Sequence, residues 1–256
     1  MKKSVAFASR AILSIVLTTF SLQVWGADCS STDIILSTQV DVDNFQSTYG
    51  GGGVCDVVSG TLTIGKSHYT STEFSDITSL DGLSSLTRVG GYLYISRNPD
   101  LTNLNGLSNL TRVDGRYGGL AIYNNDSLTN LDGLSNVTSI GGLEIGGNPA
   151  LTNIDGLSKI TSVDGDFFDI SYNDALTNLN GLSSLTRVNA IFYIFGNDSL
   201  TNLDGLSSLT SISSDLDVQS NRVLSRCTGI ALLLGWPVGP PNDNIGGYIS
   251  FNGNPP

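Results

Sequence analysis

The stretch LTNLDGLSSLTSISSDLDV, residues 200–218, decides the fold because its apolar residues recur at an unusual spacing. From Leu200 to Ile212 they lie three residues apart, and Leu216 and Val218 lie two apart. An amphipathic helix needs an average spacing of about 3.6 residues, and a half-buried strand needs about 2. Steps of three residues fit short extended segments separated by bends, and the last pair predicts a true strand.

This pattern recurs six times along the chain, at spacings of 23 to 27 residues. One unit cannot fold alone, because about seven inward side chains do not offset the conformational entropy lost by some ~24 residues. Stacked units cover one another's apolar faces and pair their backbones, which predicts an all-β solenoid of short parallel strands with one continuous core. The units begin at Ile77, Leu101, Leu128, Leu151, Leu176 and Leu200.

The segments on either side of the repeats differ in composition and predict caps over the ends of the core. We expect an N-terminal cap over residues 27–60, the repeat region over 61–223 and a C-terminal cap over 224–256. The run Leu224–Trp236 is too continuously apolar to continue the repeat and predicts a short capping helix. Residues 249–251 match the alternating strand again and predict a final strand of the sheet.

The beginning of the chain has the pattern of a secretory signal peptide. Lys2, Lys3 and Arg10 flank an apolar run over residues 11–24, which small residues follow. We expect a signal peptide over residues 1–26 and therefore a secreted, periplasmic or cell-surface protein. An uncleaved membrane anchor is the alternative, although the apolar run is short for a span of about 20 residues.

The charge of the chain excludes several classes of partner. It carries 23 acidic and 12 basic residues, a formal net charge of −11, and the signal peptide contains no acidic residue. Such a surface repels nucleic acid and anionic lipid. We therefore expect no nucleic-acid partner and no membrane insertion after signal cleavage. The acidic balance is consistent with simple solubility as well as with an acidic recognition surface.

Three cysteines remain in the exported part of the chain, and export favours a disulfide. Cys29 and Cys55 lie near the mature N-terminus, and their pairing would stabilise the fold by about 3 kcal/mol. Cys227 is then left over, either as a buried free thiol or with a partner beyond residue 256.

A pair formed by aspartate or asparagine and glycine recurs once in each unit. We expect this pair to form a turn in which glycine supplies a positive φ and the acidic or amide side chain bonds to the bend. The pairs are Asp81–Gly82, Asn105–Gly106, Asp132–Gly133, Asp155–Gly156, Asn180–Gly181 and Asp204–Gly205.

An asparagine also recurs at the end of each alternating strand. We expect each of these side chains to satisfy turn amides and to stack on the asparagine of the next coil. The column consists of Asn98, Asn125, Asn148, Asn173, Asn197 and Asn221.

Two other features of the repeat suggest rival functions. The acidic turn column could hold calcium, but the nonapeptide spacing of calcium-binding β-rolls is missing, so we expect no metal and no other cofactor. Columns of threonine such as Thr102 to Thr201 resemble those of ice-binding proteins. The threonines stand singly, however, which favours ordinary β-branched residues at strand positions.

Units such as LTNLDGLSNVTSIGGLEIGGNPA (128–150) resemble the repeats of the receptor L-domain family. This family consists of leucine-rich, right-handed β-solenoids, and the likeness covers about residues 29–256. The start of the chain and the small number of cysteines favour the branch of exported bacterial proteins. The resemblance implies extracellular recognition or cell-surface structure and no catalysis. The cysteine-rich modules of the receptors are absent from this sequence, and the C-terminal cap has no cysteine pair.

If the recurring columns build the scaffold, the residues that vary on the alternating strand carry the function. Exposed aromatic residues gathered on one sheet face indicate a site for a protein or a carbohydrate. The alternative is a purely structural role, in which the aromatic residues stack on one another across the strands. The candidate ligand-binding face comprises Tyr92, Tyr94, Arg97, Arg116, Tyr117, Tyr123, Phe167, Tyr172, Tyr193 and Phe195.

The sequence offers little for catalysis. His68 is the only histidine, and a lone loop histidine is typical of a surface residue. Asp164, Asp166 and Asp169 lie close together and keep a polysaccharide-active enzyme as an alternative. The sequence therefore predicts an exported, non-catalytic recognition or structural module, with an unidentified extracellular protein or glycan as its partner.

Overall fold

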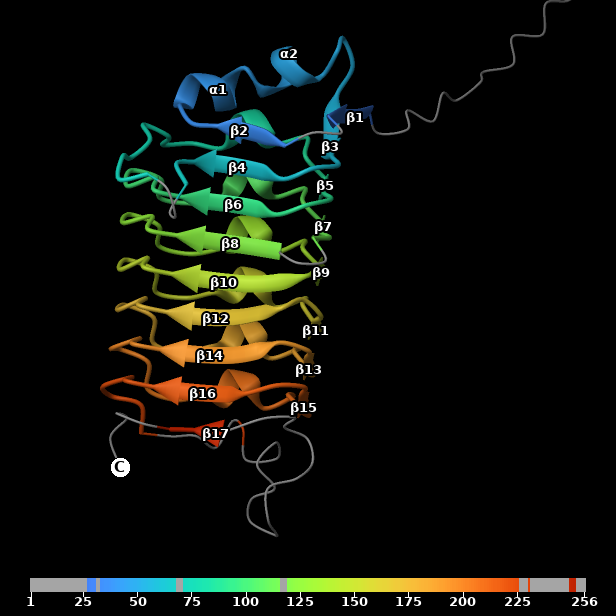
Figure 1. The fold of residues 1–256 in the computed structure, drawn as a ribbon. Coiled ribbons are helices and arrows are strands. Elements are labelled where there is room, and N and C mark those ends of the chain that lie inside the picture. Colours follow the sequence, from blue (N-terminus) through green and yellow to red (C-terminus); the bar gives the residue numbers. More distant parts are fainter. Residues whose placement is uncertain are drawn as a thin grey trace, which may run out of the picture.

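The computed structural model describes residues 27–30, 33–67, 71–115, 119–225, 230 and 249–251. Within them the chain forms a right-handed solenoid whose coils stack into a rod (Figure 1). Every strand pairs in parallel with the equivalent strand of the next coil, and the all-β solenoid predicted from the sequence is confirmed.

Two parallel sheets and a row of 3₁₀ turns form the sides of the rod. Sheet A contains β1 (Ala27–Ser30), β3 (Cys55–Val58), β5 (Arg88–Val89), β7 (Arg112–Val113), β9 (Ser139–Ile140), β11 (Ser162–Val163), β13 (Arg187–Val188) and β15 (Ser211–Ile212). Sheet B contains β2 (Ile34–Leu36), β4 (Leu62–Gly65), β6 (Leu93–Ser96), β8 (Gly119–Tyr123), β10 (Gly142–Gly146), β12 (Phe167–Ser171), β14 (Ile191–Phe195), β16 (Leu216–Gln219) and β17 (Ile249–Ser250). The 3₁₀ turns are Asp81–Leu83, Asn105–Leu107, Asp132–Leu134, Asp155–Leu157, Asn180–Leu182 and Asp204–Leu206.

The apolar positions of the repeat line one continuous core. In the unit that begins at Leu200, the exposed fraction of every predicted core residue is at most 1%. Three-residue steps arise because each coil changes direction several times and sends one side chain inward on each short side. Phe168 and Phe192 lie inside the rod on neighbouring strands and stack with their ring centroids 4.2 Å apart.

The glycine of each 3₁₀ turn is required for a different reason from the one expected. None of these glycines has a positive φ. A Cβ on Gly106 would instead lie 1.8 Å from the carbonyl oxygen of Leu80 in the preceding coil. The bend is also held by another residue than expected, since the Asn105 N–H donates to the side chain of Asn103. The turn glycines therefore let adjacent coils touch.

The asparagine column forms the predicted buried ladder. All six side chains are fully buried. Asn125, for example, donates its Nδ2 to the Oδ1 of Asn148 and to the carbonyl oxygen of Ile95 in the preceding coil. Its backbone N–H donates to the same Asn148 oxygen. The column thus satisfies buried polar groups that the corners of the coils expose to the core.

The threonine columns lie beside the strands and not within them, contrary to our expectation. Thr111 directly precedes β7, and its N–H and hydroxyl both donate to the carbonyl oxygen of Thr87. In the other column Thr129 bonds to Thr102 in the same way. These exposed threonines therefore tie neighbouring coils together at their surface.

Two short helices cover the N-terminal end of the core: α1 (Gln39–Asp43) and α2 (Phe45–Tyr49) (Figure 1). Thr38 caps α1 in a capping box with Asp41. Val42 and Phe45 are fully buried and close the first core layer. β2 pairs with β4, so the predicted N-terminal cap contributes a strand of its own to sheet B.

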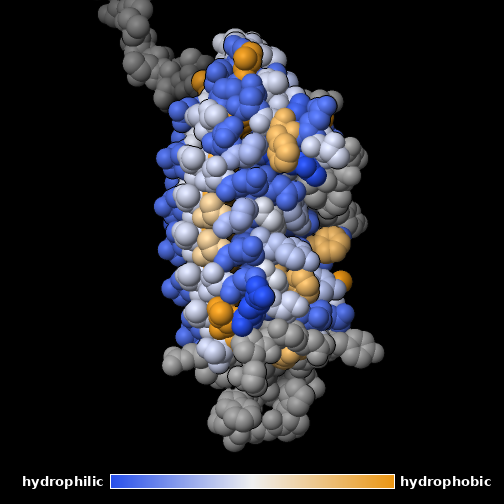
Figure 2. All heavy atoms as spheres, turned by 90° about the vertical axis from the view of Figure 1, so that its left-hand side faces the viewer, coloured by the Kyte–Doolittle hydropathy of each residue, from blue (hydrophilic) through white to orange (hydrophobic). Residues whose placement is uncertain are grey.

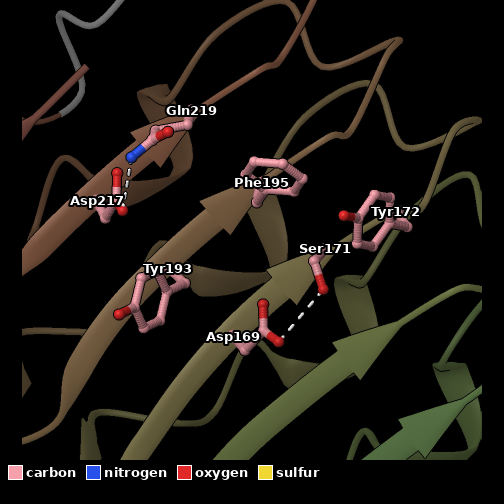
Figure 3. Close-up of a pocket in the computed structure, with 7 residues that line it drawn as sticks. All are labelled: Asp169, Ser171, Tyr172, Tyr193, Phe195, Asp217 and Gln219. Atoms are coloured by element: carbon pink, nitrogen blue, oxygen red, sulfur yellow. Dashed lines mark hydrogen bonds between the residues drawn. The ribbon is translucent and has the colours of Figure 1, made fainter. Parts of the chain in front are cut away.

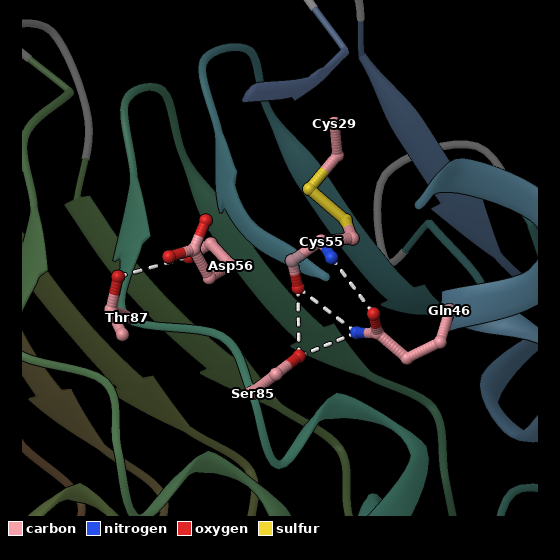
Figure 4. The surroundings of a disulfide bond; sticks show 6 residues. All are labelled: Cys29, Gln46, Cys55, Asp56, Ser85 and Thr87. Carbon is pink, nitrogen blue, oxygen red and sulfur yellow. Dashed lines mark hydrogen bonds between the residues drawn. A yellow bond between two sulfur atoms is a disulfide. The ribbon is translucent and has the colours of Figure 1, made fainter. Parts of the chain in front are cut away.

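The expected disulfide joins Cys29 in β1 to Cys55 in β3 (Figure 4). Gln46 of α2 holds the same corner, because its side chain accepts from the Cys55 N–H and donates to the Cys55 carbonyl oxygen. The disulfide therefore ties β1 to β3 within sheet A, and the Gln46 amide fixes α2 to the same strand.

At the other end β17 pairs with β16 and is the final strand that the sequence predicts. The described residues exclude the signal peptide, Cys227 and most of the run 224–236 that predicts a capping helix; of that run they include Leu224, Ser225 and Ile230. Among the helices that the structure does describe, none has the length and apolar character needed to span a membrane.

Candidate functional site

The predicted aromatic residues that the structure describes lie on or beside the outer face of sheet B, which we define by two columns of outward side chains. Neighbours in each column are paired in the strand register, so they lie one coil apart. The central column runs Thr63, Tyr94, Ala121, Glu144, Asp169, Tyr193, Asp217 and Ser250. The end column runs Ser96, Tyr123, Gly146, Ser171, Phe195 and Gln219.

The register does not place aromatic residues directly opposite one another in these columns. Tyr94 is paired with Thr63 and Ala121, and Tyr193 is paired with Asp169 and Asp217. The face therefore carries separate groups of aromatic residues divided by acidic and small side chains.

One group lies near the N-terminal end of the rod. The rings of Tyr92 and Tyr94 stack with their centroids 4.9 Å apart. Arg97 lies at the following corner with its guanidinium 5.8 Å from the ring centroid of Phe74. Phe74 is more than half exposed, so a cation–π pair forms part of this surface.

Tyr123 leans from β8 across β10 in the middle of the face. Its hydroxyl donates to Oε2 of Glu144 at 2.6 Å. Gly146 makes room for the ring, because a Cβ there would lie 2.5 Å from Cε1 of Tyr123. The hydrogen bond orders both side chains at the surface.

The second group encloses a shallow pocket of about 260 Å³ over β12, β14 and β16 (Figure 3). The aromatic residues of its lining are Tyr172, Tyr193 and Phe195, and the sequence predicted all three. Four polar residues complete the lining: Asp169, Ser171, Asp217 and Gln219. The two aspartates occupy outward positions that the alternating pattern identifies, whereas Ser171 and Gln219 were missed. The same alternation could have identified Ser171 and Gln219, because both occupy the position of Phe195 in the end column.

Tyr172 stands at a strained corner beside this pocket. Its φ is +55°, in the left-handed region, which costs a residue with a Cβ on the order of 1–2 kcal/mol. The ring is 57% exposed and meets Phe195 edge to face, with centroids 5.2 Å apart. Gly196 of the next coil leaves space for it, because a Cβ at 196 would lie 3.1 Å from Cδ1 of Tyr172.

The carboxylates of the pocket are in an unfavourable environment. Burial and the neighbouring Glu144 raise the pKa of Asp169 to about 6, against the lowering effect of a hydrogen bond from the Ser171 hydroxyl. Asp217 accepts a hydrogen bond from Gln219 on Oδ2, while its buried Oδ1 accepts none. An incoming donor would therefore improve the surroundings of both groups.

The acidic field extends beyond the pocket. Burial and the charges of Glu144 and Asp166 raise the pKa of Tyr92, against the lowering effect of a hydrogen bond with Tyr94. The described lining of the pocket contains no basic residue. The corners that follow the sheet B strands form the adjoining surface of the rod (Figure 2). Polar side chains cover most of this surface, and apolar residues form separate spots on it.

The structure describes one further predicted residue. Phe167 begins β12 and is 46% exposed, opposite Ile191 on the neighbouring strand. Arg116, Tyr117 and the histidine His68 lie outside the described residues.

The aspartates that suggested a polysaccharide-active enzyme do not converge. Asp164 follows β11 of sheet A, where it accepts hydrogen bonds from Arg187 and Asn189. Asp169 lies on the outer face of sheet B instead. The three carboxylates therefore do not form one site.

Comparison with known proteins gives one finding. No curated protein matches the chain. The family model of the receptor L domain matches residues 54–161, a segment that contains the first three complete repeat units. Receptor L domains are non-enzymatic modules that bind extracellular ligands. The match shows that residues 54–161 are similar to this family.

Proposed function

We propose that the chain is an exported recognition module that binds a protein or a glycan through the outer face of sheet B, as a secreted, periplasmic or cell-surface protein. The observation that carries this proposal is the pocket of Tyr172, Tyr193 and Phe195, where half-exposed rings adjoin carboxylates that lack full hydrogen bonding. Exposed aromatic residues of this kind contribute most of the binding energy at many interfaces.

Two further observations support an exported location for the chain. The signal-peptide pattern over residues 1–26 and the disulfide between Cys29 and Cys55 fit an oxidising compartment outside the cytosol. The start of the chain and its small number of cysteines favour the exported bacterial branch of the receptor L-domain family. A solenoid suits recognition, because its rigid coils hold outward side chains at a fixed spacing while those side chains vary freely.

The test replaces Tyr94, Tyr123 and Tyr193 together by serine. All three side chains point outward, so we expect the melting temperature to change little while ligand capture is lost. Capture is measured on glycan arrays and by pull-down from the native medium, with each hit then assayed as a purified compound.

A matched control replaces Thr111, Thr186 and Thr210 by serine on another exposed side of the rod. It should bind like the wild type. Unchanged capture by the tyrosine variant would reject this face, and release of products from a polysaccharide would reject a non-catalytic module.

A further inference from the structure

We infer that the pocket over β12, β14 and β16 receives a cationic side chain, lysine or arginine, from a basic segment of a protein partner. This inference rests on the proposed function and names the chemistry of its ligand. The described lining of the pocket combines aromatic rings and two carboxylates, and it contains no basic residue. That combination suits an ammonium or a guanidinium group, which is attracted by ring faces and carboxylates alike.

The arrangement of the residues fits a single long side chain. Tyr193 lies between Asp169 and Asp217 in the central column, so a ring is flanked by one carboxylate on each side. Phe195 and Tyr172 form the apolar wall toward the corner (Figure 3). At about 260 Å³ the pocket is smaller than most small-molecule sites, which begin near 300 Å³.

Electrostatics favours a cation over a neutral ligand such as a sugar. Asp169 is partly buried next to Glu144, its partner in the strand register, and the negative charge of Glu144 opposes ionisation of Asp169. Oδ1 of the Asp217 carboxylate is buried and accepts no hydrogen bond. A sugar hydroxyl would supply a hydrogen bond but would leave these charges unbalanced, whereas a cation supplies both. The net charge of −11 also steers a basic segment toward the molecule.

The first experiment measures binding of fluorescein-labelled pentaarginine and pentalysine to the full chain by fluorescence anisotropy, at an ionic strength of about 0.15 M. A neutral Gly-Ser peptide serves as the reference probe. We expect the cationic peptides to bind and the D169N/D217N variant to bind them about tenfold more weakly or worse.

The control variant D132N/D155N separates the pocket from general attraction between opposite charges. It removes the same two charges from the exposed 3₁₀ row, where Asn105 and Asn180 occupy the equivalent positions in other coils. We expect its affinity to stay within about twofold of the wild type, because distant surface charges are largely screened. An equal loss in both variants would overturn the pocket assignment.

The aromatic contribution is tested by Tyr172→Asn, because Asn124 holds the same left-handed corner in another coil. We expect this variant to fold normally and to bind pentaarginine about two- to fivefold more weakly. Unchanged affinity in this variant and in Tyr193→Leu would contradict a role for the rings.

A neutral oligosaccharide, maltohexaose, provides the opposing outcome. If it binds and loses affinity in the pocket variants while pentaarginine does not, the ligand is not cationic, and the proposed recognition face still stands. If no cationic peptide binds better than the Gly-Ser peptide, the inference also fails. The proposed function itself fails separately, when the triple tyrosine variant captures the same partners as the wild type.

Discussion

Two residues that are adjacent in the six coils from β6 to β16 follow opposite rules. The first is the corner residue after each sheet B strand, and the second is the buried ladder asparagine. The corner position has a φ between +55° and +65° in all six coils, yet the ladder position is always asparagine while the corner varies. The corner residues are Arg97, Asn124, Gly147, Tyr172, Gly196 and Ser220.

The direction of the side chain explains the difference. A ladder side chain points into the rod, where any other residue leaves donors and acceptors of two neighbouring coils without partners. A corner side chain points outward, so the only cost of a larger residue is the strain of its backbone. Arg97 and Tyr172 adopt this backbone conformation with strain, whereas Gly147 adopts it without strain. Strained residues of this kind are common at functional sites.

The largest effect is expected from breaking the ladder with Asn148→Ala. Asn148 donates to the carbonyl oxygen of Ile122 and accepts from the N–H of Asn125, and both groups would stay buried without these partners. We expect the free energy of unfolding to fall by about 3–5 kcal/mol, measured by urea denaturation.

The control for this variant is Asn136→Ala, because Asn136 is exposed at the surface of the same coil and bonds to Ser108. It should cost less than about 1 kcal/mol. A loss in Asn148→Ala as small as in the control would show that the ladder does not stabilise the rod.

An intermediate effect is expected from Asp169→Asn on the outer face. The folded pKa of about 6 lies above the ordinary value of 3.8, so the folded state binds a proton more tightly than the unfolded state. The wild type therefore loses stability as the pH rises from about 4 to about 6.

Relative to the wild type, the asparagine variant should be about as stable at pH 4 and more stable at pH 7, by on the order of 1–3 kcal/mol. Thermal unfolding of both proteins across this range measures the difference. Asp41 and Asp114, whose pKa values are lowered, are present in both proteins and cancel. A difference that does not change with pH would contradict the raised pKa.

The smallest effect is expected from Tyr172→Asn. Asparagine tolerates the left-handed corner better, but the variant loses the contact of the ring with Phe195. These terms nearly cancel, so the free energy of unfolding should change by less than about 1 kcal/mol. A loss above about 2 kcal/mol would mean that Tyr172 is a structural residue and that outward corners are not free to vary.

The same distinction explains what the sequence predicts. The inward positions follow from spacing within one unit, so the core and the asparagine ladder were predicted. The pairing of Cys29 with Cys55 was predicted for another reason, the expected export of the chain. The role of Gly106 was not, because the carbonyl oxygen that excludes a side chain there belongs to Leu80 of another coil.

The site was only partly predictable for a related reason. Alternation along one strand identifies Tyr193 and Phe195 as outward residues. It does not say that the ring of Tyr172 lies over Gly196, nor that Gln219 bonds to Asp217 at the pocket. Those contacts depend on the register between coils and on the space that a glycine leaves.

The asparagine ladder also has a direction. The bonds between its asparagines all run one way, because each side chain from Asn98 to Asn197 donates to the asparagine of the next coil toward the C-terminus. At the N-terminal end of the row the Ser75 hydroxyl donates to Oδ1 of Asn98, in the place that an asparagine takes in the later coils. One serine thus terminates the row within a single molecule.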